Sequence, residues 1–441
     1  MTTLSATTER PRMSTFSQAM LSLFWFGSGV LWTVVLITTL PAQANMIGGE
    51  AVKGTTLGIV LLLGAFVSMV VAPVFGALSD RIVTRFGRRR PWIVIGTLMN
   101  ILGLFGLAYF PRANDMSSLP LYIFAFMWVE FWNNVATAPY SALIPDVVPK
   151  DQRGSASGWY GLMNIFGTFV GALAPFIFVT NGQTDIVGLY YFVAFVLFFA
   201  MLGTVVFVHE PQVTVNPPPF RLGEFTRGLV APLKDHDFRW VFLTRFLMVM
   251  GTFTVQEFLQ FYMGDVVKDF NFFGMQFASN AAQAASVFIL GLLVGALPSS
   301  ITAGYLSDRF GRKLMVYISS AFQAVVPMIF VLFAPNFAIT AMLGIVFGIG
   351  YGAYQSVDWA MASEVLPSED DYAKDMGVWH VAFTLPQVIA TPIAGFLLDT
   401  FNRVGTTTGA SPTMGYNVIF TLATVYFILG TVLVRRIRKV K

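Results

Sequence analysis

A single acid lies near the middle of the apolar stretch 119–143, which reads LPLYIFAFMWVEFWNNVATAPYSAL. Asn133 and Asn134 follow Glu130 by three and four residues, so a helix would place the three side chains on one face. A charge at the centre of a membrane helix costs about 2.5–3.5 kcal/mol on insertion scales, so an acid kept there is expected to have a function. A carboxylate held away from water takes up a proton readily. We therefore expect Glu130 to bind and release a proton; the alternative is a hydrogen bond between helices, which an amide would also supply.

Further polar side chains recur on helical faces of three apolar stretches in the second half of the sequence. They are Arg245, Gln256, Glu257, Gln260, Tyr354, Gln355 and Gln387. Amides and aromatic rings that face a cavity suit a neutral polyol ring, so we expect these residues, with Asn133 and Asn134, to bind a substrate. Two alternatives stay open. Arg245 could extend from a helix end toward the membrane surface, and Glu257 could be a second ionisable site or lie at the outer mouth of the cavity.

These residues need helices that cross a membrane, and the composition supplies them. Of the 441 residues, 56% are hydrophobic and only 11% are charged, whereas soluble domains carry about 25% charged residues. A membrane-spanning helix needs about 20 apolar residues, and barrel strands are much shorter. Twelve stretches qualify, at 17–40, 55–78, 91–110, 119–143, 155–180, 187–208, 239–263, 277–302, 314–334, 337–361, 376–398 and 414–434. The sequence predicts an all-α membrane protein with twelve transmembrane helices.

The basic residues predict the orientation of these helices. If the N-terminus is cytoplasmic, 22 of the 27 lysines and arginines fall on the cytoplasmic side and four outside, while Arg245 lies within a span. Both termini are therefore expected in the cytoplasm. The sequence has no cysteine and only three histidines, which leaves no disulfide, no thiol nucleophile and no histidine-rich metal centre. We expect no cofactor and no metal.

A repeated pattern divides the chain into two halves. GALSDR at 76–81 corresponds to GYLSDR at 304–309, and DVVP at 146–149 corresponds to EVLP at 364–367. The polar, proline-rich segment 209–238 separates six spans from six. We therefore expect a cytoplasmic tail, two six-helix bundles joined by a linker, and a basic tail, with the bounds 1–16, 17–208, 209–238, 239–434 and 435–441.

Acids and arginines gather at the cytoplasmic ends of both predicted bundles. The set is Asp80, Arg81, Arg88 and Asp146 in the first half and Asp308, Arg309, Arg312 and Glu364 in the second, with Asp358 near the end of its span. Ion pairs among them could hold the cytoplasmic side closed while the cavity opens outward, as a gate. The alternative is that the arginines only fix the topology and bind lipid phosphate, although topology gives no role to the carboxylates.

Two six-helix halves with SDR and GRR after the second and eighth spans resemble the major facilitator superfamily. The resemblance implies that a substrate lies between the halves near the middle of the bilayer, and that the halves rock around it. The longer motifs SDRIVTRFGRRRPW (79–92) and VEFWNNVATAPYSALIPD (129–146) are similar to the glycoside–pentoside–hexuronide and sucrose carriers. By this resemblance Glu130 takes the place of the coupling aspartate of sucrose carriers, which implies proton-coupled sugar uptake.

The sequence also departs from relatives within that branch. Sodium-coupled melibiose-type permeases carry two aspartates on span two, where this chain has Ser68 and Ala72, so sodium coupling is not expected. Plant sucrose carriers pair their acid with an arginine in span five, and 155–180 contains none.

Three functions follow from these patterns. The leading hypothesis is a proton-coupled sugar symporter, the second is a proton-driven exporter of drugs or metabolites on the same fold, and the third is a membrane-embedded enzyme. We expect a monomer in a bacterial inner membrane that binds a small molecule and lipid and has no nucleic-acid partner.

Overall fold

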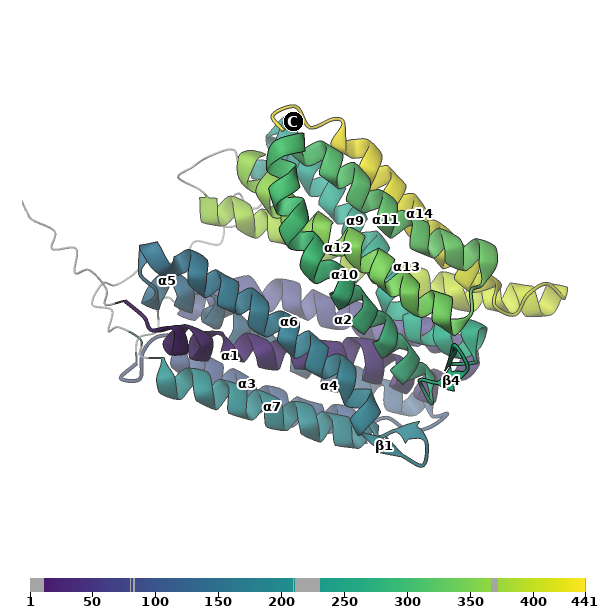
Figure 1. Ribbon diagram of the computed structural model, residues 1–441. Coiled ribbons are helices and arrows are strands. Elements are labelled where there is room, and N and C mark those ends of the chain that lie inside the picture. The colour runs from purple at the N-terminus through teal and green to yellow at the C-terminus, as the bar shows by residue number, and fades with distance from the viewer. Residues whose placement is uncertain are drawn as a thin grey trace, which may run out of the picture.

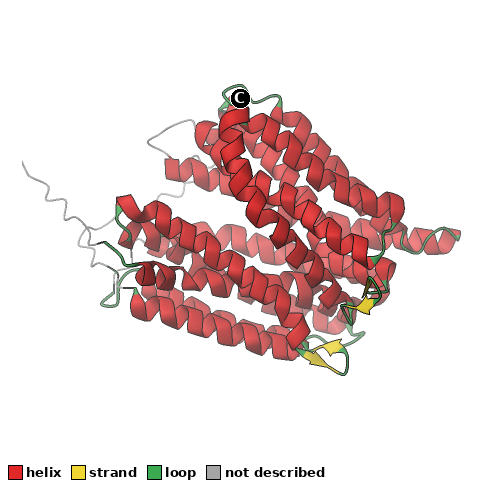
Figure 2. Cartoon of the chain, viewed as in Figure 1, coloured by secondary structure: helices red, strands yellow, loops and turns green. Residues whose placement is uncertain are grey.

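The computed structural model describes residues 12–79, 81, 84–208, 210, 231–365 and 372–440. Long helices make up almost all of this part of the chain, and two short hairpins lie at one end of the molecule (Figure 2). The α-helices are α1 (Thr15–Trp32), α2 (Leu40–Ser79), α3 (Arg90–Tyr109), α4 (Leu119–Ser141), α5 (Leu143–Val147), α6 (Arg153–Ile177), α7 (Ile186–Phe207), α9 (His236–Tyr262), α10 (Ala281–Phe310), α11 (Arg312–Phe333), α12 (Phe337–Val365), α13 (Tyr372–Thr408) and α14 (Met414–Val434). The hairpins pair β1 (Val179–Thr180) with β2 (Gln183–Thr184) and β3 (Asn271–Phe272) with β4 (Met275–Gln276).

The helical stretch Thr15–Ser79 crosses the bundle twice. Its 65 residues would measure about 98 Å as one straight helix, three times the hydrocarbon core of a bilayer. The helix breaks at Gly49, whose φ of 63° is disfavoured for residues with a Cβ. A Cβ on Gly48 would lie only 2.6 Å from Thr56 Oγ1, so the chain doubles back here.

Counting this reversal gives the predicted number of spans. Ten segments of the described chain are long and apolar enough to cross a membrane, with Thr15–Ser79 counted once. Its second pass is the eleventh, and α4, which carries the acid and two asparagines, is the twelfth. The prediction of an all-α, twelve-helix membrane protein is confirmed.

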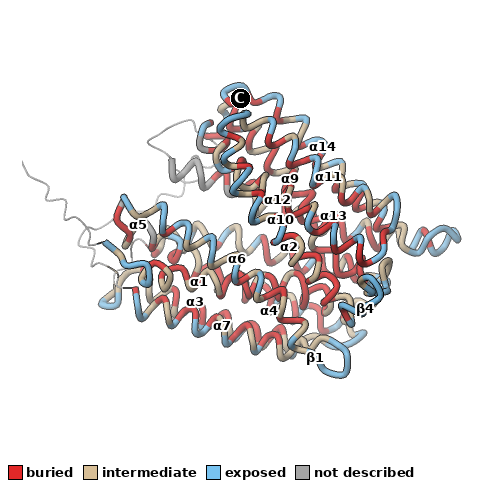
Figure 3. Tube along the Cα trace, viewed as in Figure 1, coloured by how far each residue is buried: buried red, intermediate tan, exposed pale blue. Residues whose placement is uncertain are grey.

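The helices form two bundles that meet along a shared interface (Figure 1). In the first half α1 packs on α6 and α3 packs on α4; in the second half α10 packs on α12 and α9 packs on α14. Across the halves, α13 packs on α2 and α10 packs on α6. The buried residues lie on the faces that the helices turn toward one another (Figure 3). Residues 1–11 of the predicted tail and 211–230 of the predicted linker lie outside the described residues.

Two segments of π-helix interrupt the first helix of each half. Thr33–Thr39 follows α1, and Met263–Val267 follows α9. A π-helix widens the turn and leaves carbonyl groups without their usual partner, and it occurs often at functional sites. These two segments therefore place such carbonyl groups directly after α1 and α9, the first helix of each bundle.

Contacts between the halves concentrate where the two hairpins lie, which we call the hairpin end. Lys53 Nζ lies 2.6 Å from Asp265 in the other half, and only 2% of the lysine side chain is exposed. Asp399 accepts hydrogen bonds from the backbone N–H groups of Gly54 at 3.0 Å and Thr55 at 2.6 Å. Figure 1 shows the bundles diverging toward the opposite end, which carries α5. The halves are therefore locked together at the hairpin end.

This closure depends on bare backbone at Gly395. A Cβ there would lie 2.0 Å from the carbonyl oxygen of Gly54, so any side chain forces α13 and α2 apart. We predict that Gly395→Leu opens the hairpin end. The natural chain has no cysteine, so Thr391→Cys, buried beside this contact, reports the opening directly. Maleimide should label it at least tenfold faster when Gly395→Leu is also present.

The control for this experiment is Gly154→Leu. Gly154 is also helical, but a Cβ there meets no atom within 4 Å. Labelling of Thr391→Cys should therefore not change. Equal labelling rates in all three backgrounds would show that the glycine contact does not hold this end closed.

Candidate functional site

A hollow of about 30 Å³ lies in the second half, between α9, α12 and α13. Its lining is Met248, Val249, Thr252, Phe253, Gln256, Tyr351, Tyr354, Gln355 and Phe383. This volume is about the share of one water molecule, so the hollow admits a larger molecule only after these helices move apart. Amides, hydroxyls and the rings of two phenylalanines and two tyrosines line it. Of the predicted substrate-binding residues, Gln256, Tyr354 and Gln355 lie here.

A buried ion pair adjoins this hollow. Arg245 on α9 donates from Nη1 to the Asp358 carboxylate on α12, and the two side chains are 4% and 0% exposed. Tyr354 Oη donates to the other oxygen of Asp358 at 3.2 Å. The guanidinium carbon also lies 3.6 Å from the ring centre of Trp379, a cation–π contact from α13. Arg245 is thus enclosed by three helices and does not extend to the membrane surface.

Asp358 and Gln260 have partners that the sequence did not name. Asp358, a predicted gate residue, is buried against Arg245, about 14 Å along α9 from its start. Gln260, a predicted substrate ligand, lies between the halves: with the amide oriented so that its nitrogen faces acceptors, it donates to the carbonyls of Ile37 at 2.7 Å and Thr38 at 3.0 Å, and its role in substrate binding stays a prediction. Those carbonyls belong to the π-helix after α1, so Gln260 joins the halves.

Glu130 lies in the first half, between α4 and α2, and is 4% exposed. Asn134 Nδ2 is its hydrogen-bond donor at 3.4 Å and also donates to Ser68 on α2 at 2.9 Å. Gly64 on α2 leaves the room that the Phe126 ring and the glutamate fill, because a Cβ there would lie 2.2 Å from Phe126 Cε1 and 3.1 Å from Glu130 Cγ. The acid, Asn134 and the serine therefore form one polar cluster between two apolar helices, as the shared helical face predicted for the acid and amide.

The other predicted residues lie apart from this cluster and from the hollow. Asn133 is buried on α4. Glu257 is 1% exposed, and its Oε2 has no hydrogen-bond partner among the described residues. Gln387 is half-buried on α13. These three residues stay predictions as substrate ligands.

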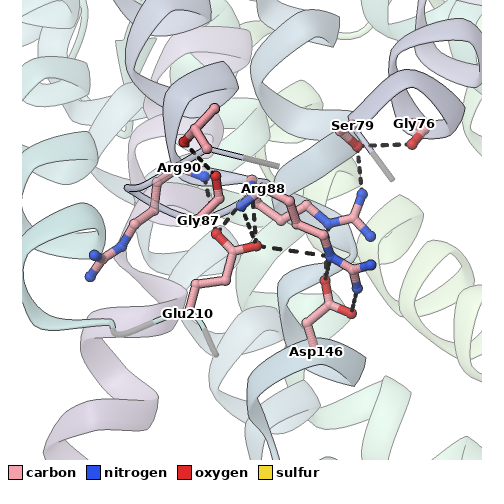
Figure 4. A network of polar contacts seen from close by, with 9 residues as sticks. Gly76, Ser79, Gly87, Arg88, Arg90, Asp146 and Glu210 are labelled. Atoms are coloured by element: carbon pink, nitrogen blue, oxygen red, sulfur yellow. Dashed lines mark hydrogen bonds and ion pairs between the residues drawn. The ribbon is translucent and has the colours of Figure 1, made fainter. Parts of the chain in front are cut away.

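Two predicted gate residues of the first half, Arg88 and Asp146, lie in a cluster at the end that carries α5 (Figure 4). Arg88 Nε lies 3.2 Å from Asp146, to which its Nη2 also donates. Arg89 Nε donates to the same carboxylate at 2.9 Å and its Nη1 to Ser79 Oγ at 2.5 Å. Glu210, just after α7, accepts from the backbone N–H groups of both arginines at 2.9–3.0 Å. The cluster ties α2, α3, α5 and α7 together.

The second half repeats this arrangement with fewer residues. Arg312 Nε donates to Glu364 at 3.0 Å, its Nη1 donates to Ser307, and its Nη2 lies 2.6 Å from Asp308. The guanidinium of Arg309 lies over the ring of Tyr305, 5.6 Å from its centre.

Both clusters join helices of the same half, and their role as a gate stays a prediction. In the first half Arg81 donates to the carbonyl of Ala77, within its own helix. Asp80 lies outside the described residues.

Sequence reasoning missed Glu210 of the first cluster and the contacts of the hairpin end. Arg89, in the arginine run after the second span, allows both an ion pair with Asp146 and a topological role; in the structure it is 3% exposed and hydrogen-bonded to Asp146. Glu210 was placed in the linker; its signal is an acid directly after a span on the basic side of the protein. Lys53 and Asp399 lie at the predicted ends of spans, where sequence alone does not name a partner.

Comparison with known proteins identifies the family. The model of a family described as MFS/sugar transport protein matches residues 50–436. The chain belongs to this family. A homologue of the multi-drug resistance efflux pump PmrA from Lactococcus lactis is 23% identical over 380 residues, which cover 83% of this chain and 86% of the homologue.

Relatives that carry sugars match shorter segments of this MFS chain. The general alpha-glucoside permease of Schizosaccharomyces pombe is 25% identical over 177 residues, 38% of this chain and 31% of the permease. The sucrose transport protein SUC3 of Arabidopsis thaliana is 26% identical over 131 residues, 25% of this chain and 22% of that protein. The resemblance to sugar carriers stated above is confirmed.

A solved structure has the same fold. A bacterial homolog of the human lysosomal transporter Spinster, in an inward-facing conformation, superposes with a TM-score of 0.71 at 12% identity, covering 96% of this chain and 97% of the other. The chain is therefore an integral membrane transporter of the major facilitator type.

The buried arginine of the first cluster gives a test of this geometry. We predict that Arg89→Gln lowers the free energy of unfolding by about 2–3 kcal/mol, because it leaves Asp146 and Ser79 buried with fewer partners. The measurement is the thermal midpoint of the purified transporter in detergent. Arg85→Gln is the control, since Arg85 is exposed in the same loop and its loss should stay within about 0.5 kcal/mol. Equal midpoints for the two variants would contradict the structural role of Arg89.

Proposed function

We propose that this transporter is a proton-coupled sugar symporter that works by alternating access. The observation that carries the proposal is Glu130, a buried carboxylate whose hydrogen-bond donor among the described residues is an amide. A carboxylate without a cation beside it is stable away from water when it carries a proton. Glu130 takes up a proton when its side faces outward and releases it when water reaches it from the cytoplasm.

The side chains around the hollow in the second half supply the sugar side of the proposal, and the hollow has to widen before a sugar can enter. Gln256 and Gln355 each offer a donor and an acceptor, as sugar hydroxyls require. Phe253 and Phe383, with ring centres 5.6 Å apart, offer apolar surface to the C–H face of a sugar ring. The α-glucoside permease and the sucrose transport protein, both partial matches, support the choice of a sugar.

The orientation in the membrane is part of the proposal. The distribution of lysine and arginine supports a cytoplasmic location for the end that carries α5. With that orientation the hairpin end faces outward, and its closure by Lys53, Asp265 and Asp399 corresponds to an inward-facing state. Both termini are then cytoplasmic.

Glu130→Gln tests the proton step. In vesicles with an imposed pH gradient of about two units and radiolabelled sucrose or maltose, the natural chain should accumulate sugar up to about 100-fold for one proton per sugar. Glutamine keeps the hydrogen bond to Asn134 but cannot exchange a proton. The variant should therefore lose accumulation and keep sugar exchange between the two sides.

Glu50→Gln is the matched control, because 74% of that glutamate side chain is exposed; it should accumulate sugar normally. Accumulation by Glu130→Gln equal to that of the natural chain would refute the proton role. Sugar uptake that does not respond to the gradient would refute symport altogether.

Proton-driven export is the second candidate function. The efflux pump homologue matches more of the chain than either sugar relative does. Everted vesicles incubated with external ethidium distinguish the two: an exporter accumulates the dye inside when the interior is acidified, whereas the proposed symporter does not.

A further inference from the structure

The two halves hold different chemistry at one equivalent contact. In the second half this contact is the buried pair of Arg245 on α9 and Asp358 on α12. Arg245 is nine residues after the start of α9, and Phe24 is nine residues after the start of α1. Asp358 corresponds to Tyr140 on α4 with the same offset of 218 residues that relates EVLP to DVVP.

The first half fills this contact with aromatic rings. Phe24 and Tyr140 pack with ring centres 4.7 Å apart. Tyr160, seven residues after the start of α6, stacks on Tyr140 at 5.3 Å with nearly parallel planes. Its counterpart is Trp379, seven residues after the start of α13, which packs against the Arg245 guanidinium. Corresponding helices therefore meet in both halves, once with charge and once without, although Trp379 packs on Arg245 whereas Tyr160 stacks on Tyr140.

The uncharged version shows that the fold does not need an ion pair here. Taking two charges out of water is costly, and well-packed apolar side chains are often as stabilising as a buried pair. The pair also lacks one hydrogen bond that it could make, since Arg245 Nε is buried without a hydrogen-bond partner among the described residues. If this contact served only to stabilise the fold, the two charges would bring no advantage over apolar side chains.

Tyr354 connects the pair to the hollow. Its hydroxyl donates to Asp358, and its side chain lines the hollow beside Gln355. With its proton directed at Asp358, the Tyr354 oxygen is left as an acceptor for a group inside the hollow. A hydrogen bond received there strengthens the one donated to Asp358, because linked hydrogen bonds polarise one another.

We propose that Arg245 and Asp358 are positioning residues for the substrate: Asp358 fixes Tyr354 as an acceptor for a sugar hydroxyl, and Arg245 neutralises Asp358. This inference rests on the proposed function, because it assumes that a sugar occupies the hollow. It assigns the pair to substrate affinity and leaves the proton step to Glu130.

The test transfers the aromatic contact of the first half into the second. The double variant Arg245→Phe with Asp358→Tyr should fold with a thermal midpoint close to that of the natural chain. It should raise the sucrose or maltose concentration for half-maximal exchange at least tenfold. Arg245→Met with Asp358→Asn repeats the test with side chains that fill the space differently. If both double variants fail to fold, or if either folds and keeps the natural half-saturating concentration, the pair is a structural brace and the proposal is wrong.

A double-mutant cycle adds a readout that a structural role would not produce. Tyr354→Phe and Asp358→Asn should each raise the half-saturating sugar concentration about tenfold, and together about tenfold, because both act through one hydroxyl: the first removes the Tyr354 oxygen, and the second replaces the charged acceptor with an amide whose NH2 group competes for that oxygen. Effects that multiply to about a hundredfold would contradict the link through Tyr354. If the natural chain carries neither sugar under any gradient, the proposed function and the positioning role both fail; if it carries sugar and the variants bind normally, only the positioning role fails.

Discussion

An unpaired charge away from water is so costly that it determines where charged groups lie in this transporter. Arg245 and Asp358 pair within the second bundle, and Lys53 is enclosed by two carboxylates at the hairpin end. The arginines of the repeated loops meet acids where the helices end. Glu130 and Glu257 are exceptions: the hydrogen-bond donor to Glu130 among the described residues is an amide, and Glu257 Oε2 has no partner among them. A group of that kind has to be neutral when enclosed and charged when water reaches it, which links its ionisation to the movement of the bundles.

Comparison of equivalent positions in the two halves shows where such a carboxylate departs from the common packing. The offset that relates Asp358 to Tyr140 also relates Gly348 to Glu130, and the offset between the SDR loops relates Leu292 to Gly64. In the first half a glycine on α2 leaves room for the acid from α4. In the second half the sizes are exchanged, because Gly348 of α12 packs directly on the Leu292 backbone of α10. The contact of α2 with α4 and the equivalent contact of α10 with α12 are both tightly packed, and only the first contains a carboxylate. The carboxylate thus lies at a position of the repeat where the packing accepts either a small or a large side chain.

Fold features that depend on the length and repetition of apolar stretches could be predicted from the sequence. The partners of individual side chains could not, because they depend on the depth of each residue in the membrane and on which helices are neighbours. Twelve apolar stretches and two copies of a loop motif were enough for the fold. The sequence FGR occurs at 86–88 and again at 310–312, which would equate Arg88 with Arg312, but four extra residues in the first loop change the geometry. Arg89 contacts Ser79 and Asp146 as Arg312 contacts Ser307 and Glu364. No spacing rule could show that Asp358 meets an arginine 113 positions away, because that pairing depends on which helices are adjacent.

The contacts that hold the hairpin end closed are weak enough to break when the halves move apart. Asp399 caps the backbone N–H groups that begin the second pass of α2, which would otherwise lack partners. Hydrogen bonds to a charged group contribute about 1.5–3 kcal/mol each, and water replaces most of that when the halves separate. Shifting a two-state equilibrium from 1:99 to 99:1 takes about 5.5 kcal/mol. A few such bonds, together with the Lys53–Asp265 pair, are of that magnitude. Binding of a substrate and a proton can therefore offset the closure, whereas a continuous apolar interface between the halves would hold one state permanently.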